Sequence, residues 1–136
     1  MKLTLAKKKR SVLNSGLKKT ITSGGVVMWH LNGLPHSPWG LKPAISQPDG
    51  CEDWYKKGFR HRDGDKPAVV RPWGEMEWYK EGRLHREGDK PARILPTKRQ
   101  WWVDGELHRD GGLPAVEYGD GSREWWENGK RIVRWS

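Results

Sequence analysis

Four histidines occupy one position of a recurring sequence pattern and are the first candidates for chemistry: His36, His61, His85 and His108. Histidine serves as a metal ligand and as a general acid or base. Equivalent residues of stacked hairpins would lie roughly 10 Å apart, two strand spacings, whereas zinc holds a nitrogen ligand at about 2.1 Å. We therefore predict no metal site and no cofactor. Each histidine is expected to be structural, its ring packed on tryptophan and the donors of the His-Arg pair holding the next turn.

Carboxylate-bearing turns follow two of these histidines, at Asp63-Gly64-Asp65 and Glu87-Gly88-Asp89. An active site is usually a unique, asymmetric cluster, whereas these turns recur with the repeat and are each followed by Lys-Pro-Ala. We expect their acids to pair with Arg62 and Arg86 or with the adjacent repeat. The sequence also has no glycine-rich phosphate loop and no serine nucleophile elbow. We predict that the chain is not an enzyme.

The single cysteine, Cys51, precedes Trp54 in an expected strand. One cysteine forms no intrachain disulfide and no cysteine-rich metal site, so we expect it to be a small packing residue in a reducing, cytoplasmic compartment. No run of 18 apolar residues is present to span a membrane. The N-terminus has no apolar stretch of the length found in secretory signals.

A repeat with a period of about 24 residues must position these side chains. Tryptophan is followed four residues later by glycine at Trp29/Gly33, Trp54/Gly58, Trp78/Gly82, Trp101/Gly105 and Trp125/Gly129. Each histidine stands three residues after one of the first four glycines, and Pro-Ala follows it at residues 43–44, 67–68, 91–92 and 114–115. We divide the chain into a basic N-terminal arm, 1–27, and a repeat domain, 28–136.

The local chemistry of the repeat favours strands and turns. Each Pro-Ala begins a short β-favouring segment, where proline suits the first strand position. Residues 75–80 alternate like a half-buried strand, and the glycines that follow, such as Gly82, suit tight turns with positive φ. One copy is thus a hairpin plus a return segment carrying His-Arg. We predict an all-β, elongated stack of antiparallel hairpins, with Trp29 as first rung and the truncated fifth copy as the other cap.

The composition requires an unusual core. Only 34% of the residues are apolar and 32% are charged, yet ten are tryptophan. A disordered chain of this polarity would be poor in aromatic residues, whereas each aromatic ring buries roughly 150–250 Å². We therefore expect a thin fold held together by layers of tryptophan.

The pattern resembles the MORN family of β-hairpin repeats, which have a Trp-x-x-x-Gly core. It is more similar to a variant form, Trp-x-x-x-Gly-x-x-His-Arg-x-x-Gly-x-Pro-Ala, seen in phage, large-DNA-virus and bacterial antitoxin-like proteins. The resemblance covers residues 28–136 and leaves the arm outside it. It implies a non-catalytic binding scaffold and names no partner. Lipid-binding roles of the common MORN form transfer weakly, because that form has glycines where this chain has His-Arg and Pro-Ala.

Aromatic residues also recur directly after the repeat tryptophans, at Tyr55, Tyr79, Trp102 and Trp126. Neighbouring strand residues point to opposite faces, so these four should form an aromatic stripe facing away from the repeat tryptophans. Two explanations remain open. The arm or the return segments cover the stripe, or it is a binding surface, because aromatics are enriched in protein interfaces and stack single-stranded bases.

The arm carries seven of the nine net positive charges and no acidic residue: Lys2, Lys7, Lys8, Lys9, Arg10, Lys18 and Lys19. The repeats hold 19 basic and 17 acidic residues and are nearly neutral. Leu13, Leu17 and Ile21 after the cluster allow a short basic amphipathic helix. The arm is a solvated tail, a targeting peptide or a polyanion-binding segment. Its high density of positive charge favours binding to nucleic acid by counterion release.

Three functional hypotheses follow, all non-enzymatic. In the first, an accessory protein, plausibly phage or viral, docks on a macromolecular assembly with its repeat face on protein and its arm on nucleic acid or an acidic surface. In the second, an antitoxin-like or anti-defence inhibitor blocks a protein target through the aromatic stripe alone. The third, a membrane-associating scaffold of the MORN kind, ranks below both.

Overall fold

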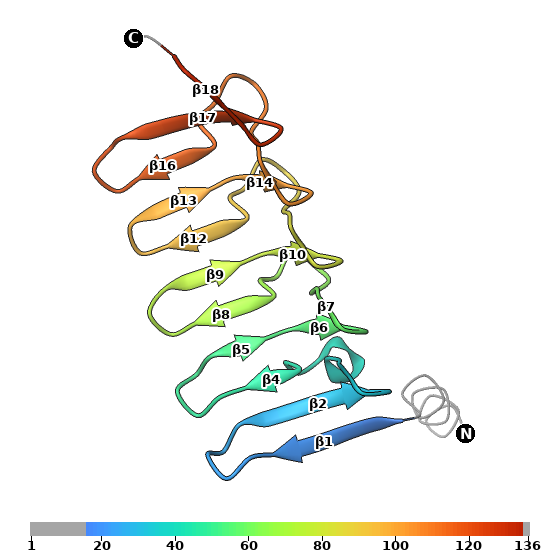
Figure 1. Cartoon of the computed structure of the whole chain (residues 1–136). Coiled ribbons are helices and arrows are strands. Elements are labelled where there is room, and N and C mark those ends of the chain that lie inside the picture. The colour runs from blue at the N-terminus through green and yellow to red at the C-terminus, as the bar shows by residue number, and fades with distance from the viewer. Residues whose placement is uncertain (1–15, 135–136) are drawn as a thin grey trace.

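The computed structural model describes residues 16–134, and one long antiparallel sheet runs through them from end to end (Figure 1). Its strands follow the order β1-β2-β4-β5-β8-β9-β12-β13-β16-β17-β18. The prediction of stacked antiparallel hairpins is confirmed. The main strands are β1 (Leu17–Ile21), β2 (Val27–Leu31), β4 (Ile45–Ser46), β5 (Glu52–Asp53), β8 (Val69–Arg71), β9 (Glu75–Glu77), β12 (Arg93–Leu95), β13 (Lys98–Gln100), β16 (Val116–Tyr118) and β17 (Arg123–Glu127).

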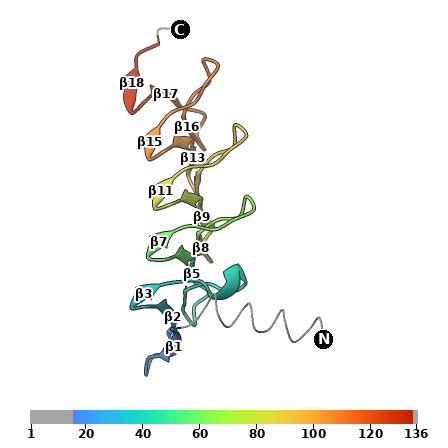
Figure 2. The same cartoon turned by 90° about the vertical axis from the view of Figure 1, so that its right-hand side faces the viewer.

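A second, smaller hairpin follows each tryptophan-bearing strand. Figure 2 shows these hairpins along one side of the stack, while longer loops project from the other side. The small hairpins consist of β3 (Leu34–Pro35) on β2, β6 (Tyr55–Lys56) with β7 (Phe59–Arg60), β10 (Tyr79–Lys80) with β11 (Arg83–Leu84), β14 (Trp102–Val103) with β15 (Glu106–Leu107), and β18 (Lys130–Ile132) on β17. Each copy of the repeat therefore contains two hairpins.

The spacing from tryptophan to glycine to histidine follows from the geometry of the small hairpin: tryptophan and histidine pair across it, and glycine lies in its turn. In the third copy the amide of His85 donates to the carbonyl of Trp78 at 3.0 Å and so closes the hairpin. Its turn residues Glu81 and Gly82 have φ values of 50° and 83°, as a type I′ turn requires. The same pair of positive φ values recurs at 32–33, 57–58, 104–105 and 128–129.

A row of alternating tryptophan and alanine crosses the sheet and forms its core. The strand register places Ala68 between Trp54 and Trp78, on the same face as both. The amide of Trp54 donates to the carbonyl of Ala68 at 2.7 Å. Ala68, Ala92 and Ala115 are fully buried, and Trp54, Trp78 and Trp101 beside them are only 5–7% exposed, while Trp125 at the end of the row is half-buried. The Pro-Ala of the repeat is therefore the small partner that leaves room for two indole rings.

The long loops, here called return loops, lead from each histidine to the next Pro-Ala and cover the Trp–Ala row. Their ranges are 36–43, 61–67, 85–91 and 108–114, and the first contains a short 3-10 helix, η1 (Pro38–Gly40). The guanidinium group of Arg86 lies 3.7 Å from the ring centroid of Trp78. Arg62 on Trp54 and Arg109 on Trp101 repeat this stacking at 3.6 and 3.8 Å. Each arginine thus shields one indole face from water.

Strand β1 lies inside the range 1–27 that was assigned to the basic arm. It pairs with β2 along its whole length, from Leu17 opposite Leu31 to Ile21 opposite Val27. The helical interpretation was therefore wrong for Leu17 and Ile21, which belong to an extended strand, while Leu13 lies outside the described residues. Trp29 remains the first tryptophan of the row, but it does not cap the sheet, because β1 adds one more strand beyond it. Within residues 16–134, no helix is long and apolar enough to cross a bilayer.

Candidate functional site

The aromatic stripe occupies the first position of four of the five small hairpins, at Tyr55 in β6, Tyr79 in β10, Trp102 in β14 and Trp126 in β17. All four side chains are half-buried, whereas the preceding Trp54, Trp78 and Trp101 are buried. The return loops pack on the repeat tryptophans through their arginines. Strand alternation therefore points the stripe side chains away from the repeat tryptophans, while Tyr55, Tyr79 and Trp102 also line grooves between neighbouring return loops. The described part of the arm continues the sheet as β1.

The polar tips of the stripe are held by side chains two residues earlier on the same face. Tyr79 Oη donates to Glu77 at 3.0 Å and Trp126 Nε1 donates to Glu124 at 2.9 Å. Trp102 Nε1 lies 3.4 Å from Gln100 Oε1. These contacts fix the ring orientations, so the stripe is preorganised for contact.

Electrostatics follow from these hydrogen bonds. The indole of Trp126, assisted by the hydroxyl of Tyr118, lowers the pKa of Glu124 by stabilising its charged form. Burial, together with the neighbouring Glu77 carboxylate, raises the pKa of Tyr79. At neutral pH the stripe therefore presents neutral rings backed by carboxylates.

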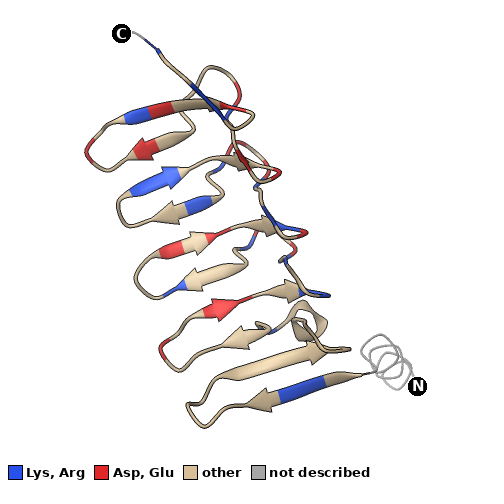
Figure 3. Cartoon of the chain, viewed as in Figure 1, with Lys and Arg blue, Asp and Glu red and all other residues tan. Residues whose placement is uncertain are grey.

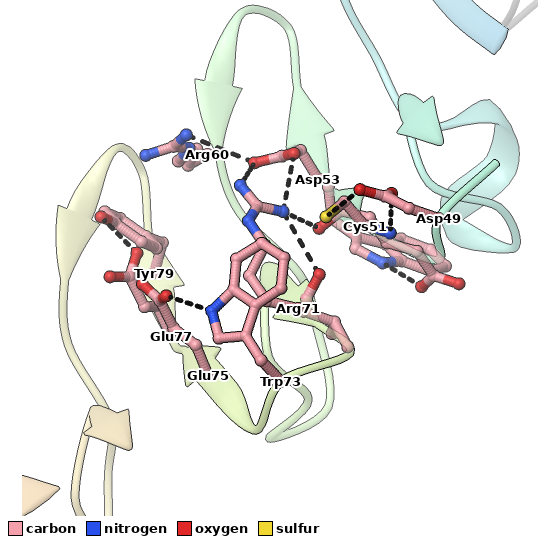
Figure 4. Close-up of polar contacts among 12 residues, drawn as sticks. Asp49, Cys51, Asp53, Arg60, Arg71, Trp73, Glu75, Glu77 and Tyr79 are labelled. Carbon is pink, nitrogen blue, oxygen red and sulfur yellow. Dashed lines mark hydrogen bonds and ion pairs between the residues drawn. The ribbon is translucent and has the colours of Figure 1, made fainter. Parts of the chain in front are cut away.

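A charged cluster of Asp53, Arg60 and Arg71 lies beside the second member of the stripe, Tyr79 (Figure 4). Asp53, which is only 5% exposed, accepts from Arg71 at 3.0 and 3.1 Å and from Arg60 at 3.3 Å. The guanidinium of Arg60 lies 6.0 Å from the ring centroid of Tyr55 and 5.4 Å from that of Tyr79. Arg60 therefore lies near both rings and extends the stripe as one cationic and aromatic surface.

The residues that support the stripe were not singled out from the sequence. They are the buried Asp53, Glu77 and Gln100 and the half-buried Glu124, each directly before a repeat tryptophan. A carboxylate or amide at this position in four copies was a visible signal. Its meaning depends on the sheet face and on the hydrogen bonds, which the spacing alone does not give.

The histidines are structural, but their roles differ from the expected ones. Nδ1 of His61 accepts a hydrogen bond from the backbone amide of Glu81, in the turn of the next small hairpin, at 3.1 Å. His36, His85 and His108 make the same contact with Lys57, Asp104 and Asn128. The stacking group on tryptophan is the arginine guanidinium, and the histidine accepts from the next turn through Nδ1. The tautomer follows: Nδ1 is unprotonated and Nε2 carries the hydrogen.

The carboxylate turns separate into two roles. Asp63 and Glu87 bind Nε2 of their own His61 and His85 at 2.7 and 2.8 Å. Asp65, in contrast, binds the next loop, with Oδ1 at 2.9 Å from Nε of Arg86. The prediction of pairing with the adjacent repeat is confirmed for Asp65 with Arg86 and for Asp89 with Arg109. It was wrong for Asp63 and Glu87, which pair with the histidines of their own loops instead of with Arg62 and Arg86.

The candidate polyanion-binding residues are only partly described. Lys18 and Lys19 are exposed on β1, and Lys19 Nζ lies 5.5 Å from the ring centroid of Trp29. Lys2, Lys7, Lys8, Lys9 and Arg10 lie outside the described residues. Along the sheet, basic and acidic residues are interspersed (Figure 3), and several face each other as ion pairs, such as Arg93 with Glu77 and Arg99 with Glu117.

Cys51 is buried, and Asp49 accepts from its thiol at 3.4 Å. Burial and the Asp49 contact raise its pKa, which disfavours the reactive thiolate. The described range 16–134 contains no cluster of three or more histidine, cysteine, aspartate or glutamate side chains arranged to hold a metal ion.

No family model, no curated protein and no solved structure matches the chain.

Proposed function

We propose that this chain is a non-catalytic binding module of the MORN-variant type that docks on a macromolecular assembly. The aromatic stripe meets a protein, and the basic arm contacts nucleic acid or an acidic surface of the same assembly. The observation that carries the proposal is the stripe itself: four half-buried aromatic rings, one in each of the second to fifth copies, three of them hydrogen-bonded through their polar tips to the side chain two residues earlier. Rigid aromatic anchors are the residues that dominate protein interfaces.

The chemistry of the other polar groups supports a role without catalysis. The histidines, the loop carboxylates and most return-loop arginines form the same contacts in successive copies, and those contacts hold one copy to the next. A lone cysteine with a raised pKa fits a cytoplasmic protein, which we include in the proposal.

The arm supports the nucleic-acid part of the proposal through charge alone. Residues 1–27 carry seven basic and no acidic side chains, and such a cluster gains affinity for polyanions by releasing counterions. Five of the seven precede β1, so a deletion of residues 1–15 removes most of the arm's charge and none of the strands that the structure describes.

A second candidate is an antitoxin-like inhibitor that acts through protein contact alone. One observation favours it: outside residues 1–15, the chain has 21 basic and 17 acidic residues, and many of the arginines are paired with carboxylates. The sheet without the arm is therefore no general polyanion-binding surface.

Affinity purification from the native cell, with nuclease present and absent, tests both candidates. The full chain is compared with Tyr79→Ala/Trp102→Ala, with a deletion of residues 1–15, and with Trp73→Ala, which removes an aromatic that is 56% exposed at a turn outside the stripe. We expect the stripe variant to lose its protein partner while Trp73→Ala keeps it. Retention of every partner by the folded stripe variant would contradict the proposal. If the partner is lost when residues 1–15 are deleted, or when nuclease is present, the first candidate is favoured over the inhibitor.

A further inference from the structure

The return loops are joined by one arginine–carboxylate pair at each junction between the second, third and fourth copies. Asp65 of the second loop holds Arg86 of the third, with Oδ1–Nε at 2.9 Å and Oδ2–NH2 at 3.4 Å. Asp89 of the third holds Arg109 of the fourth at the same two distances. The carboxylate thus lies along the outer edge of a guanidinium whose face is stacked on tryptophan. Such two-point pairs are strong and directional.

Arg62 has the same placement but forms no ion pair with a carboxylate; the Glu52 carboxylate, which accepts from Nε1 of Trp54, acts on its charge only from beyond ion-pair distance. It stacks on Trp54 at 3.6 Å and donates to the carbonyl of Pro67 at 3.1 Å, as its equivalents do to Pro91 and Pro114. All 17 acidic residues lie within the described range, and none of them forms an ion pair with Arg62. The preceding loop, 36–43, has Leu41 two residues before its proline, where the later loops have Asp65 and Asp89.

Lys66 is a second basic residue at this junction whose equivalent in the next copy binds a carboxylate. Its equivalent in the third loop, Lys90, binds the Asp65 carboxylate at 3.0 Å, so the carboxylate at that junction has two cationic partners. Together, Arg86 and Lys90 lower the pKa of Asp65 to about 2. Lys66 is exposed and, among residues 16–134, forms no ion pair with an acidic side chain. An arginine and a lysine that hold a carboxylate at the next junction are thus both present here without one.

The two ends of the row of return loops differ in which members of the arginine–carboxylate pair are absent. At the C-terminal end, Gly112 replaces the acid of the fourth loop and Ile132-Val133 replace the His-Arg of the fifth copy, so both members of the pair are absent. At the N-terminal end only the acid is absent. The N-terminal junction therefore differs from the C-terminal end of the row, where the acid and the arginine are both absent. Here Arg62 and Lys66 are retained.

A groove of about 460 Å³ lies between the first and second return loops, beside this unpaired edge. Its lining includes Lys56, Arg62, Lys66 and the exposed aromatic Trp39. Asp63, the one acid in the lining, is already bound to His61. After burial, the charges of Lys57 and Lys56 lower the pKa of His36 at the groove wall, which reflects its positive character. We call this the first groove.

We propose that the first groove binds an acidic peptide segment of a partner protein, with one side-chain carboxylate seated on Arg62 and Lys66 as Asp65 is seated on Arg86 and Lys90. The occupant is a peptide because the same arrangement in this molecule already selects a peptide carboxylate. Trp39, 45% exposed, and Leu41, 65% exposed, offer apolar contact to the residues beside that carboxylate. The site goes beyond the aromatic stripe, with which it shares only Tyr55.

The test uses the full chain and a probe copied from the occupied junction. The probe is an acetylated and amidated peptide with the sequence of residues 63–67, and its matched control carries asparagine in place of the second aspartate. The readout is the Nε–H signal of Arg62 in a ¹⁵N spectrum, assigned by its loss in Arg62→Gln. We expect the aspartate peptide to shift this signal with saturation, and the asparagine peptide to bind at least tenfold more weakly.

A loop graft provides a second variant that keeps Arg62. Replacing residues 37–42 by Arg-Asp-Gly-Asp-Lys gives the first loop the sequence of the second, including the acid. A point substitution is less suitable, because Leu41 has φ −102° whereas Asp65 has φ 50°. The graft should abolish peptide binding, while Lys130→Gln and Tyr79→Ala/Trp102→Ala leave it unchanged.

Three results would overturn the proposal: no shift of the Arg62 signal at saturating peptide, an equal shift with the asparagine peptide, or a stronger response to oligothymidylate or inorganic phosphate than to the peptide. The last result would assign the groove to phosphate groups. Since the stripe variant retains the first groove, failure here leaves the proposed function of the stripe untouched, and failure of the stripe leaves this site untouched.

Discussion

Ala92 illustrates how much a single small side chain decides in this fold. It is fully buried, and the register places it between Trp78 and Trp101 in the Trp–Ala row. Both rings are less than 8% exposed. The methyl group therefore fixes the distance at which two indoles and their covering arginines pack.

Ala92→Leu should overpack this row and destabilise the protein by about 1–3 kcal/mol. Urea denaturation followed by tryptophan fluorescence measures the free energy of unfolding. Val103→Leu enlarges a side chain that is 38% exposed on β14 and should change the stability by less than about 0.5 kcal/mol. Equal effects of the two substitutions would show that the row has spare volume.

Histidine at the small-hairpin turn makes stability depend on pH. His36 Nδ1 accepts from the amide of Lys57 at 2.9 Å, which only an unprotonated nitrogen can do. Burial, then the charges of Lys57 and Lys56, lower its pKa below 6.5. For a histidine whose pKa is lowered by folding, the unfolded chain binds the proton first as pH falls. The contribution is therefore complete above the unfolded pKa and is lost as pH falls from 6.5 toward the folded value.

His36→Asn keeps an acceptor oxygen near the position of Nδ1 but does not titrate. The difference in unfolding free energy between the wild type and this variant should shrink or reverse between about pH 7.5 and pH 5.5, and stay constant above that range. Denaturation at several pH values gives the difference directly. A difference that does not vary with pH would show that His36 titrates alike in the folded and unfolded chains.

At the scale of elements, the sequence predicted the features that depend on residues close together in the chain. The Trp-x-x-x-Gly spacing predicted the tight turns, because both central positions of a type I′ turn need positive φ and glycine supplies one of them. Strand β1 was not predicted, since Leu17–Ile21 carries neither Pro-Ala nor the tryptophan pattern and its lysines suggested an arm. The absence of a carboxylate partner for Arg62 could not be predicted either. The equivalent pair joins Arg86 to a residue 21 positions earlier in the chain, a contact that the spacing alone does not show.

The turn of the small hairpin gives a prediction with a matched control. Gly82→Ala and Gly105→Ala place a side chain at the same φ of 83°, which costs roughly 1–2 kcal/mol in each case. The new Cβ at position 82 also meets Cδ1 of Phe59 at 3.0 Å, whereas the one at position 105 comes no closer than 3.7 Å to the Arg83 side chain.

Gly82→Ala should therefore lower the thermal midpoint more than Gly105→Ala does. The two midpoints are compared by circular dichroism under identical conditions. A larger loss for Gly105→Ala would mean that contact with the preceding copy does not limit the space at these turns.

At the scale of the whole molecule, each copy contacts mainly its two neighbours, as in other repeat proteins. Backbone bonds such as Gly82 amide to Arg60 carbonyl, 2.8 Å, and Gly105 amide to Leu84 carbonyl, 2.9 Å, join the small hairpins in sequence. The arginine–carboxylate pairs join the return loops on the other side. Deviations from the repeat are thus local: they change one junction and leave the rest of the stack in place.

The row of return loops carries an arginine–carboxylate pair between the second and third copies and between the third and fourth, and lacks only the acid at the junction before them. A double-mutant cycle tests it directly. The graft of Arg-Asp-Gly-Asp-Lys over residues 37–42 is compared with the same graft carrying asparagine at its second acid, each with and without Arg62→Gln. Because the pair is partly exposed, we predict that the carboxylate stabilises the graft by about 0.2–1 kcal/mol and that this gain disappears with Arg62→Gln. An unchanged gain in the absence of Arg62 would contradict the claim.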